Sequence, residues 1–460
     1  MIFSGPLILL ATLSWGKNDR QKYLDLFVFG ILIFVMSQIK KVVIIGGGFG
    51  GVAAAKQLSD LPNVKVVLLD KRNHHLFQPL LYQVATAALS PSDIAYPLRS
   101  IFSKSSNIRV VMGNVCDIDR SAKEVILEDG GKFSYDYLIV AVGARHSYFG
   151  HPEWEEHAFG LKTLNDALRI REKILLSFEK AERAETPEEI AKYLTFVVVG
   201  GGPTGVEMAG AIAEITKKTM VEDFRKINPK VAKIILIDSG SRLLSQYPEV
   251  LSEHARRDLH QMGVRVTCGK TVTDIQADRI YFGDEMIMTA NIVWAAGNEA
   301  APLMTKLGVE LTRSKQIKVR PDFSIPDDDH VFCIGDCVSL MDANGKTVPG
   351  IAPAAAQAGR YVAKLILKRL HGQPKSGERP FKYMDKGSMA TIGRASAIAV
   401  IGPLKLTGLL AWLAWSLIHV WFLIDFRSRV AVMFSWMWSF FTHHRAARLI
   451  IYVRKRTANK

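Results

Sequence analysis

Short runs of apolar residues, many of them β-branched, recur along the chain between glycine-rich turns and longer mixed segments. Runs of this kind are typical of strands that are buried on both faces of a parallel sheet. We expect strands at residues 42–45, 64–69, 137–142, 196–199, 234–237, 292–294 and 331–334, and helices at residues 52–58 and 206–215. Strands that alternate with helices predict an α/β protein built from Rossmann-like units.

One glycine pattern follows two of these strands. The first copy reads GGGFGG at residues 46–51, and the second reads GGGPTG at residues 200–205. A strand that runs into this pattern turns tightly, brings its backbone close to a pyrophosphate and directs a helix N-terminus at the negative charge. The glycines expected at the two dinucleotides are Gly46, Gly48, Gly51, Gly200, Gly202 and Gly205. Because the pattern occurs twice, we expect two bound nucleotides.

An acidic residue ends the next strand of each unit. These residues are Asp70 and Asp238. A carboxylate at this position accepts hydrogen bonds from the ribose of a bound dinucleotide. The connection that precedes Asp238 is longer than usual, so its spacing is the weaker signal. A carboxylate here favours NADH over NADPH, although the nearby Ser239 and Arg242 offer groups that could bind a 2′-phosphate.

Small residues end two further strands and a third strand ends in an acidic residue. Ala141 and Gly143 lie at the end of one of them, and Gly297 lies at the end of its counterpart. Small residues allow a chain to pass close to a ligand. Gly335 and Asp336 end the last predicted strand, where the Asp336 carboxylate could meet the ribityl hydroxyls of a flavin.

The order of these motifs predicts a first domain that is interrupted by a second. Residues 37–150 and 291–375 would form an FAD-binding domain, and residues 151–290 would form an inserted NAD(H)-binding domain. Residues 376–460 would form a C-terminal membrane-associating region. Residues 1–36 are an apolar N-terminal extension, which is either an upstream mis-start, with Met36 as the true first residue, or a second membrane contact.

Composition narrows the class of protein further. An apolar content of 48% and 35 glycines fit an α/β enzyme. The four cysteines are too scattered for a disulfide framework or a metal site, so we expect buried thiols in a reducing compartment. The net charge is +15, and residues 360–460 carry 18 Lys and Arg against three acidic residues. These basic residues alternate with apolar runs, which argues against nucleic acid as a partner.

The C-terminal region contains two apolar runs, at residues 406–424 and 430–441, that are rich in tryptophan and phenylalanine and flanked by arginine. Such residues suit the boundary between lipid headgroups and acyl chains, and we expect an anchor on the bilayer surface. A buried helical hairpin and a single membrane span are the alternatives, although the second run is too short to cross. The few cysteines and many arginines favour the cytoplasmic face of a bacterial inner membrane.

The motif HLFQPLLYQVA at residues 75–85 is similar to the type II NADH dehydrogenases, which belong to the two-dinucleotide-binding flavoproteins. Residues 406–450 also resemble that family's membrane-associating region. The resemblance implies that NADH reduces non-covalent FAD and that FAD reduces a membrane quinone without proton pumping. It further implies that Pro79 lines the flavin ring, that Glu207 contacts the nicotinamide and transfers protons, and that Gln357 lies in the family's quinone motif, whose other polar residues are missing here.

Other functions share this fold plan. A disulfide reductase needs a cysteine pair after the first glycine-rich turn, and residues 52–61 contain no cysteine. A sulfide:quinone oxidoreductase uses cysteines and does not need NADH, so the second glycine-rich turn argues against it. A membrane-bound redox sensor of the same fold would lack turnover. We expect His74 and His75 to bond loop backbone rather than relay protons. The identity of the quinone and the formation of a homodimer stay open.

Overall fold

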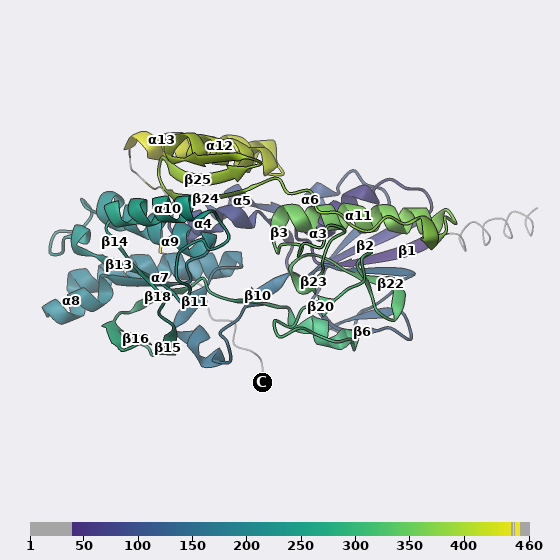
Figure 1. The fold of residues 1–460 in the computed structure, drawn as a ribbon, viewed down its shortest axis with the longest axis horizontal. Helices are drawn as coiled ribbons and strands as arrows, with labels where there is room; N and C mark the ends of the chain where they lie inside the picture. The colour runs from purple at the N-terminus through teal and green to yellow at the C-terminus, as the bar shows by residue number, and fades with distance from the viewer. Residues whose placement is uncertain (1–38, 443–444, 446, 451–460) are drawn as a thin grey trace, which may run out of the picture.

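Two parallel sheets form the body of the protein and lie in its two halves (Figure 1). The computed structural model describes residues 39–442, 445 and 447–450, so the N-terminal extension at residues 1–36 lies outside the described residues. Both sheets are built from the apolar runs seen in the sequence, because a strand that is covered on both faces must be apolar throughout.

The first sheet has the strand order β21-β22-β9-β1-β2-β5 and is parallel except for β21. Its strands are β1 (Lys40–Ile45), β2 (Val64–Asp70), β5 (Ile108–Met112), β9 (Tyr137–Val140), β21 (Ser324–Ile325) and β22 (Asp328–Cys333). Helices α3 (Phe49–Gln57) and α11 (Ala352–Leu370) pack together over it (Figure 1). The chain returns to this sheet at β22, after it has formed the strands of the second sheet.

The second sheet is fully parallel and has the order β11-β18-β12-β13-β14. Its strands are β11 (Ala158–Gly160), β12 (Thr195–Val199), β13 (Lys233–Asp238), β14 (Val264–Cys268) and β18 (Asn291–Trp294). The predicted boundary at residue 291 was therefore wrong, because β18 pairs with β12 in this sheet. The chain returns to the first unit only after Trp294.

Four helices accompany the second sheet. They are α7 (Leu164–Arg183), α8 (Pro187–Tyr193), α9 (Pro203–Glu214) and α10 (Glu249–Gln261). A short π-helix, η3 (Ile215–Thr219), continues α9. The two units are joined where β10 (Ala144–His146) pairs antiparallel with β19 (Asn298–Ala300).

The two units also contain small sheets and short helices. The additional strands are β3 (His74–Leu76), β4 (Ala95–Pro97), β6 (Val115–Asp119), β7 (Glu124–Leu127), β8 (Lys132–Ser134), β15 (Val272–Ile275), β16 (Arg279–Phe282), β17 (Glu285–Met288), β20 (Ile317–Lys318) and β23 (Val338–Ser339). The additional helices are α4 (Leu81–Ala85), α5 (Pro91–Ile94) and α6 (Leu98–Ile101). The α4 helix packs against α7 and α9, and so brings the 75–85 motif to the second unit.

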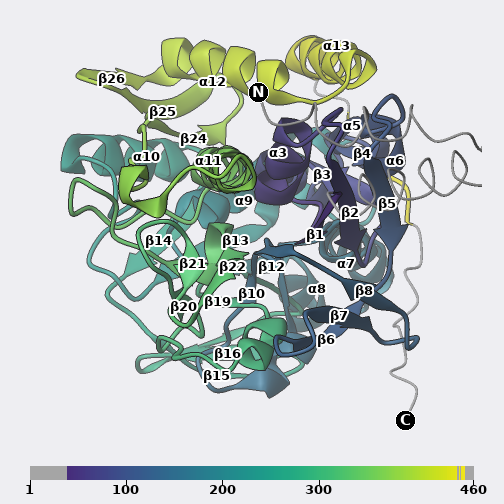
Figure 2. The ribbon, with the colours of Figure 1, turned by 90° about the vertical axis from the view of Figure 1, so that its right-hand side faces the viewer.

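The C-terminal region forms a layer above α9 and α10 (Figure 1). It contains an antiparallel sheet, β24 (Ser388–Gly393), β25 (Ser396–Ile401) and β26 (Leu404–Thr407), followed by α12 (Gly408–Phe422) and α13 (Phe426–Thr442). Figure 2 shows both helices along one side of the molecule. Much of each helix is exposed, so the alternative of a buried hairpin is wrong. Neither these helices nor any other in the described part of the chain has the length and apolar character needed to cross a bilayer.

Candidate active site

The first glycine-rich turn joins β1 to α3 and leaves open space at one glycine only. Gly46 has a φ of +107°, and a Cβ there would lie 2.3 Å from the Ala141 carbonyl oxygen. A Cβ at Gly51 would lie 1.8 Å from the Gly46 oxygen. By contrast, a Cβ at Gly48, the residue that caps α3, would meet nothing within 4 Å. Gly46 and Gly51 thus shape the turn, whereas Gly48 borders free space at a helix N-terminus, where a phosphate binds.

The second turn, between β12 and α9, repeats this geometry. Gly200 has a φ of +110°, and a Cβ at Gly205 would lie 1.7 Å from the Gly200 oxygen. A Cβ at Gly202, the cap of α9, again meets nothing within 4 Å. The residues present therefore fit two dinucleotides, one at each turn.

The two predicted ribose carboxylates occupy equivalent positions. Asp70 Oδ2 accepts a hydrogen bond from the Gly47 amide at 2.6 Å, and Asp238 Oδ2 accepts one from the Gly201 amide at 2.5 Å. Each carboxylate is thereby held beside its own glycine-rich turn. An ionised carboxylate has about four acceptor sites, so each can also accept from ribose hydroxyls. The long connection before Asp238 does not alter its place.

The small residues at the strand ends also form a matched pair. The Ala141 amide donates to the Ile45 oxygen at 2.7 Å, and the Ala295 amide donates to the Val199 oxygen at 2.7 Å. Gly143 and Gly297 each have a φ of +69°, a conformation that favours glycine. The chain therefore leaves both sheets by the same turn, close to the glycine-rich turns.

Asp336 lies in the first unit beside the start of α11. Gly335 has a φ of +82°, and a Cβ at Gly335 would lie 3.5 Å from the Ala355 side chain. The Asp336 carboxylate faces Lys162, whose pKa is lowered by burial and raised in part by that carboxylate. Lys162 was not predicted from the sequence, because only the fold brings residues 162 and 336 together. Pro79 lies half-buried in the short 3₁₀-helix 78–80 that precedes α4.

Glu207 is a half-buried carboxyl on α9. Burial raises its pKa to about 8, although the Thr391 backbone N–H donates to the carboxyl and opposes the rise. Tyr82 and Tyr247 both lie close enough for the Glu207 charge to raise their pKa values further. The partner of Glu207 is thus a strand of the C-terminal sheet. Glu207 lies beyond the first turn of α9, so its carboxyl does not cap its own helix.

The Gln357 side chain forms hydrogen bonds with the segment that leads to the C-terminal sheet. Its Nε2 donates to the Met384 oxygen at 2.9 Å, and its Oε1 accepts from the Met384 amide at 3.0 Å. Of the two histidines expected to bond loop backbone, only His75 does so, because His74 bonds a neighbouring side chain. His75 Nδ1 bonds the Gly47 oxygen at 2.9 Å, and burial lowers its pKa. His74 Nδ1 bonds the Asn73 side chain.

The cysteines differ in their surroundings. Cys333 and Cys337 are fully buried, and burial raises the pKa of Cys337 to about 12 and that of Cys333 well above its usual range. Such thiols are poor nucleophiles at neutral pH. The expectation that all four thiols are buried was wrong, because Cys116 is exposed on the small sheet β6-β7-β8 and Cys268 is half-buried. Among the described residues, no cluster of His, Cys, Asp and Glu could hold a metal ion.

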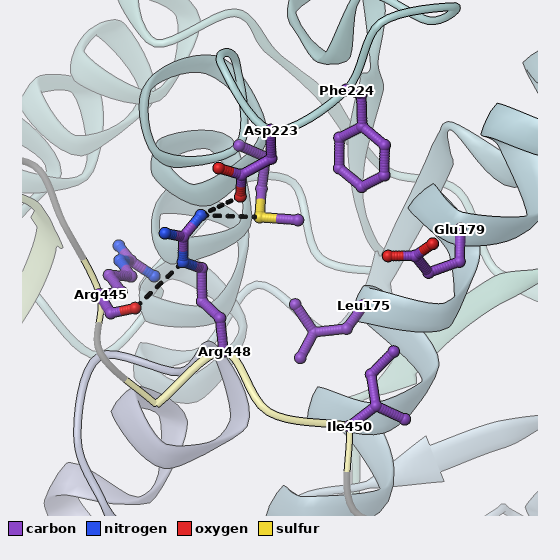
Figure 3. A pocket seen from close by; sticks show the side chains of 8 residues that line it. Leu175, Glu179, Asp223, Phe224, Arg445, Arg448 and Ile450 are labelled. Carbon is purple, nitrogen blue, oxygen red and sulfur yellow. Dashed lines mark hydrogen bonds and ion pairs between the residues drawn. The ribbon is translucent and has the colours of Figure 1, made fainter.

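A separate cavity of about 420 Å³ lies between α7, the loop that follows η3, and the C-terminal residues Arg445, Arg448 and Ile450 (Figure 3). Arg448 points to Asp223 and contacts the Met220 sulfur at 3.8 Å. Arg445 is buried and pairs with Glu214 at 2.8 Å. No residue of either glycine-rich turn lines this cavity, so we assign it no nucleotide.

Comparisons with known proteins agree with this geometry. A family described as pyridine nucleotide-disulphide oxidoreductase matches residues 40–359. The chain is 43% identical over 417 residues to the type II NADH:quinone oxidoreductase Ndh of Mycobacterium tuberculosis. The aligned residues cover 88% of this chain and 89% of that protein. The fold is similar to NDH2 from Plasmodium falciparum in complex with NADH, with a TM-score of 0.82, 21% identity and coverage of 90% and 100% of the two chains. The sulfide:quinone oxidoreductase of Aquifex aeolicus is also similar, with a TM-score of 0.65, 21% identity and coverage of 85% and 92%.

The two equivalent nucleotide turns and the matching fold define a member of the pyridine nucleotide-disulphide oxidoreductase family. Within it, the extent and level of identity identify the chain as a type II NADH:quinone oxidoreductase.

Proposed function

We propose that the protein oxidises NADH and reduces a membrane quinone, with FAD held non-covalently at the first glycine-rich turn and NADH held at the second. The observation that carries this proposal is the pair of equivalent turns, each with open space at one glycine, at Gly48 and at Gly202. FAD, when bound, accepts a hydride from NADH and passes two electrons to the quinone.

Residues of the first unit would hold FAD. We assign its pyrophosphate to Gly48 and the N-terminus of α3, its adenosine ribose to Asp70, and its ribityl hydroxyls to Asp336. Pro79 would contact the flavin ring. The remaining cofactor contacts are those of Gly46, Gly51, Ala141, Gly143 and Gly335, which shape the backbone around the site.

The second unit would hold NADH in the same way. Gly202 and the N-terminus of α9 would receive its pyrophosphate, while Gly200, Gly205 and Gly297 shape the turn. The Asp238 carboxylate is held beside this turn by the Gly201 amide at 2.5 Å. It would accept from the ribose hydroxyls and repel a 2′-phosphate, which is the physical basis for a preference for NADH over NADPH.

Glu207 and Gln357 are the polar groups that we assign to quinone reduction. With a pKa of about 8, the Glu207 carboxyl holds its proton at neutral pH and can release it to a reduced quinone oxygen. The amide of Gln357 already bonds Met384 through one N–H and one lone pair. A carboxamide has a second N–H, and we propose that it donates to a quinone carbonyl.

The exposed apolar face of α12 and α13 (Figure 2) would lie on the bilayer surface, at the cytoplasmic face of a bacterial inner membrane. The large apolar side chains exposed on these helices are Leu409, Leu410, Leu413, Leu417, Ile418, Trp421, Phe422, Phe426, Val430, Met433, Phe434, Met437, Trp438, Phe440 and Phe441. A patch of this kind on one side of a protein marks a membrane or protein interface. Arg427 and Lys405 are exposed beside it and could bind anionic headgroups.

An anaerobic titration tests the proposed reaction. NADH should bleach the visible flavin absorption of the purified, detergent-solubilised protein, and a short-chain quinone should then restore it. If NADH leaves the flavin oxidised while sulfide bleaches it, the protein is a sulfide:quinone oxidoreductase. If neither donor bleaches the flavin, the protein acts as a redox sensor or scaffold.

A further inference from the structure

A chain of hydrogen bonds leads from the apolar helix α13 into the protein interior. The indole N–H of Trp436 donates to Gln83 Oε1 at 2.7 Å, and Gln83 Nε2 donates to the Tyr82 hydroxyl at 2.9 Å. The Tyr82 hydroxyl in turn bonds Thr391 Oγ1 at 2.8 Å. Gln83, Tyr82 and Thr391 are each at least nine-tenths buried, so these bonds do not compete with bulk water.

The first two bonds of this chain, Trp436 to Gln83 and Gln83 to Tyr82, have a fixed direction. Trp436 can only donate, which sets the Gln83 amide with its oxygen toward α13 and its nitrogen toward Tyr82. The Tyr82 oxygen accepts from Gln83, and either hydroxyl can donate in the bond between Tyr82 and Thr391. The Thr391 backbone N–H then donates to the Glu207 carboxyl. The chain therefore connects α13 to Glu207 through Gln83, Tyr82 and Thr391.

Close packing explains why Thr391 reaches Glu207. Gly210 lies one turn after Glu207 on α9, and a Cβ there would lie 1.6 Å from the Ile392 oxygen of β24. The backbone of β24 therefore rests directly on α9. The register between β24 and β25 also shifts between Thr391 and Gly393. An irregularity of this kind leaves a residue unpaired in the ladder and redirects its backbone groups.

A second tie fastens the end of the chain to the same elements. Buried Arg445 donates to the Thr86 oxygen after α4 at 2.7 Å and pairs with Glu214 of α9 at 2.8 Å. Other titratable groups also lie near this chain. Tyr247 lies near Glu207, and Glu214 and Arg445 lie near Tyr82. Both α4 and α9 are thus held from the C-terminal side at two points.

We propose that Trp436, Gln83 and Tyr82 are positioning residues that hold the Thr391 backbone N–H on the Glu207 carboxyl, so that the helix that faces the membrane also supports the proton-exchanging group. The proposal rests on the proposed function of Glu207. It assigns to Trp436 a task inside the protein, distinct from the lipid contact of the exposed tryptophans on α12 and α13.

Trp436→Phe and Tyr82→Phe test this proposal, because each keeps an aromatic ring and removes one hydrogen-bonding group. The first readout is amide hydrogen exchange of the β24 segment in the FAD-loaded protein in detergent, without substrate. Loss of one hydrogen bond should speed exchange at Thr391 by about fivefold. Trp438→Phe makes the same chemical change on the exposed side of α13 and should leave this exchange rate unchanged.

The second readout is the pH dependence of quinone reduction. The Thr391 N–H lowers the pKa of Glu207, so a loosened bond should move the Glu207 titration to higher pH in both variants. Exchange at Thr391 that matches the starting protein in folded Trp436→Phe and Tyr82→Phe would overturn the proposal. If Glu207→Gln leaves the pH profile of quinone reduction unchanged, the proton role of Glu207 fails instead, while the exchange result still decides whether the chain positions its carboxyl.

Discussion

Glu207→Gln should stabilise the protein at alkaline pH relative to the unchanged chain. The folded protein raises the pKa of this carboxyl from 4.5 to about 8. Folding therefore favours the protonated form. The stability that this preference contributes is fully present below pH 4.5 and is lost as the pH rises through about 8. Glutamine is neutral throughout, keeps an oxygen that can accept from Thr391, and has no such loss.

The pKa displacement sets the size of this effect. It corresponds to at most about 5 kcal/mol of unfolding free energy between the two pH limits. Because Glu207 keeps some contact with solvent, we expect about 2 to 3 kcal/mol. For a protein of this size, that difference shifts the melting temperature by about 2 to 3 °C.

Thermal melting of both proteins in matched buffers, from pH 5 to pH 9, measures the effect. The melting temperature of the Gln variant should rise relative to that of the unchanged protein across this range. Glu249→Gln makes the same change on the exposed surface of α10, and its melting temperature should follow the unchanged protein at every pH. A constant difference between Glu207→Gln and the unchanged protein over the whole pH range would refute the raised pKa.

Four further outcomes follow from single contacts. Gly48→Val should fold without FAD, because its Cβ meets no protein atom within 4 Å but enters the space of the pyrophosphate; flavin absorbance measures this. Gly202→Val should keep FAD but lose bleaching by NADH, by the same reasoning at the second turn. Arg445→Ala should destabilise the fold by about 3 to 5 kcal/mol in denaturant unfolding, because it leaves Glu214 without its buried partner. Leu417→Glu should weaken sedimentation with phospholipid vesicles about tenfold, because it places a charge on the exposed apolar face of α12.

Local pattern was sufficient for the strands and for the two turns. The predicted strands at residues 42–45 and 196–199 lie within β1 and β12, and the helices after them begin three residues earlier than expected, at Phe49 and Pro203. Apolar periodicity does not mark a helix start, because the first turn of each helix here is formed by the glycine-rich motif itself. The position of Asp238 at the end of β13 was predicted despite its unusual spacing from the glycine-rich turn, because the apolar run that precedes it defines the strand end.

Contacts between distant residues could not be predicted in this way. Tyr82 and Thr391 are separated by 309 positions, and Gln83 and Trp436 by 353. No local signal indicates such pairs, because their contact depends on how β24 and α13 pack on the second unit. The wrong boundary at residue 291 has a related cause, since the run 292–294 has the same apolar character in either sheet and only its pairing with β12 decides its unit.

The two units begin with the same glycine-rich turn. They differ in the element that packs on the helix after this turn. On α3, Gly50 is approached by Gly359 of α11, where a Cβ would lie 2.2 Å from the Gly50 oxygen. On α9, Gly210 is approached by the backbone of β24, which brings Thr391 to Glu207. The first helix is thus covered by another helix of its own unit, whereas the second is covered by the sheet that leads to the exposed apolar helices α12 and α13. A duplicated dinucleotide fold would in this way acquire a flavin site in one copy and, in the other, a nicotinamide site whose acidic side chain is connected to the apolar surface.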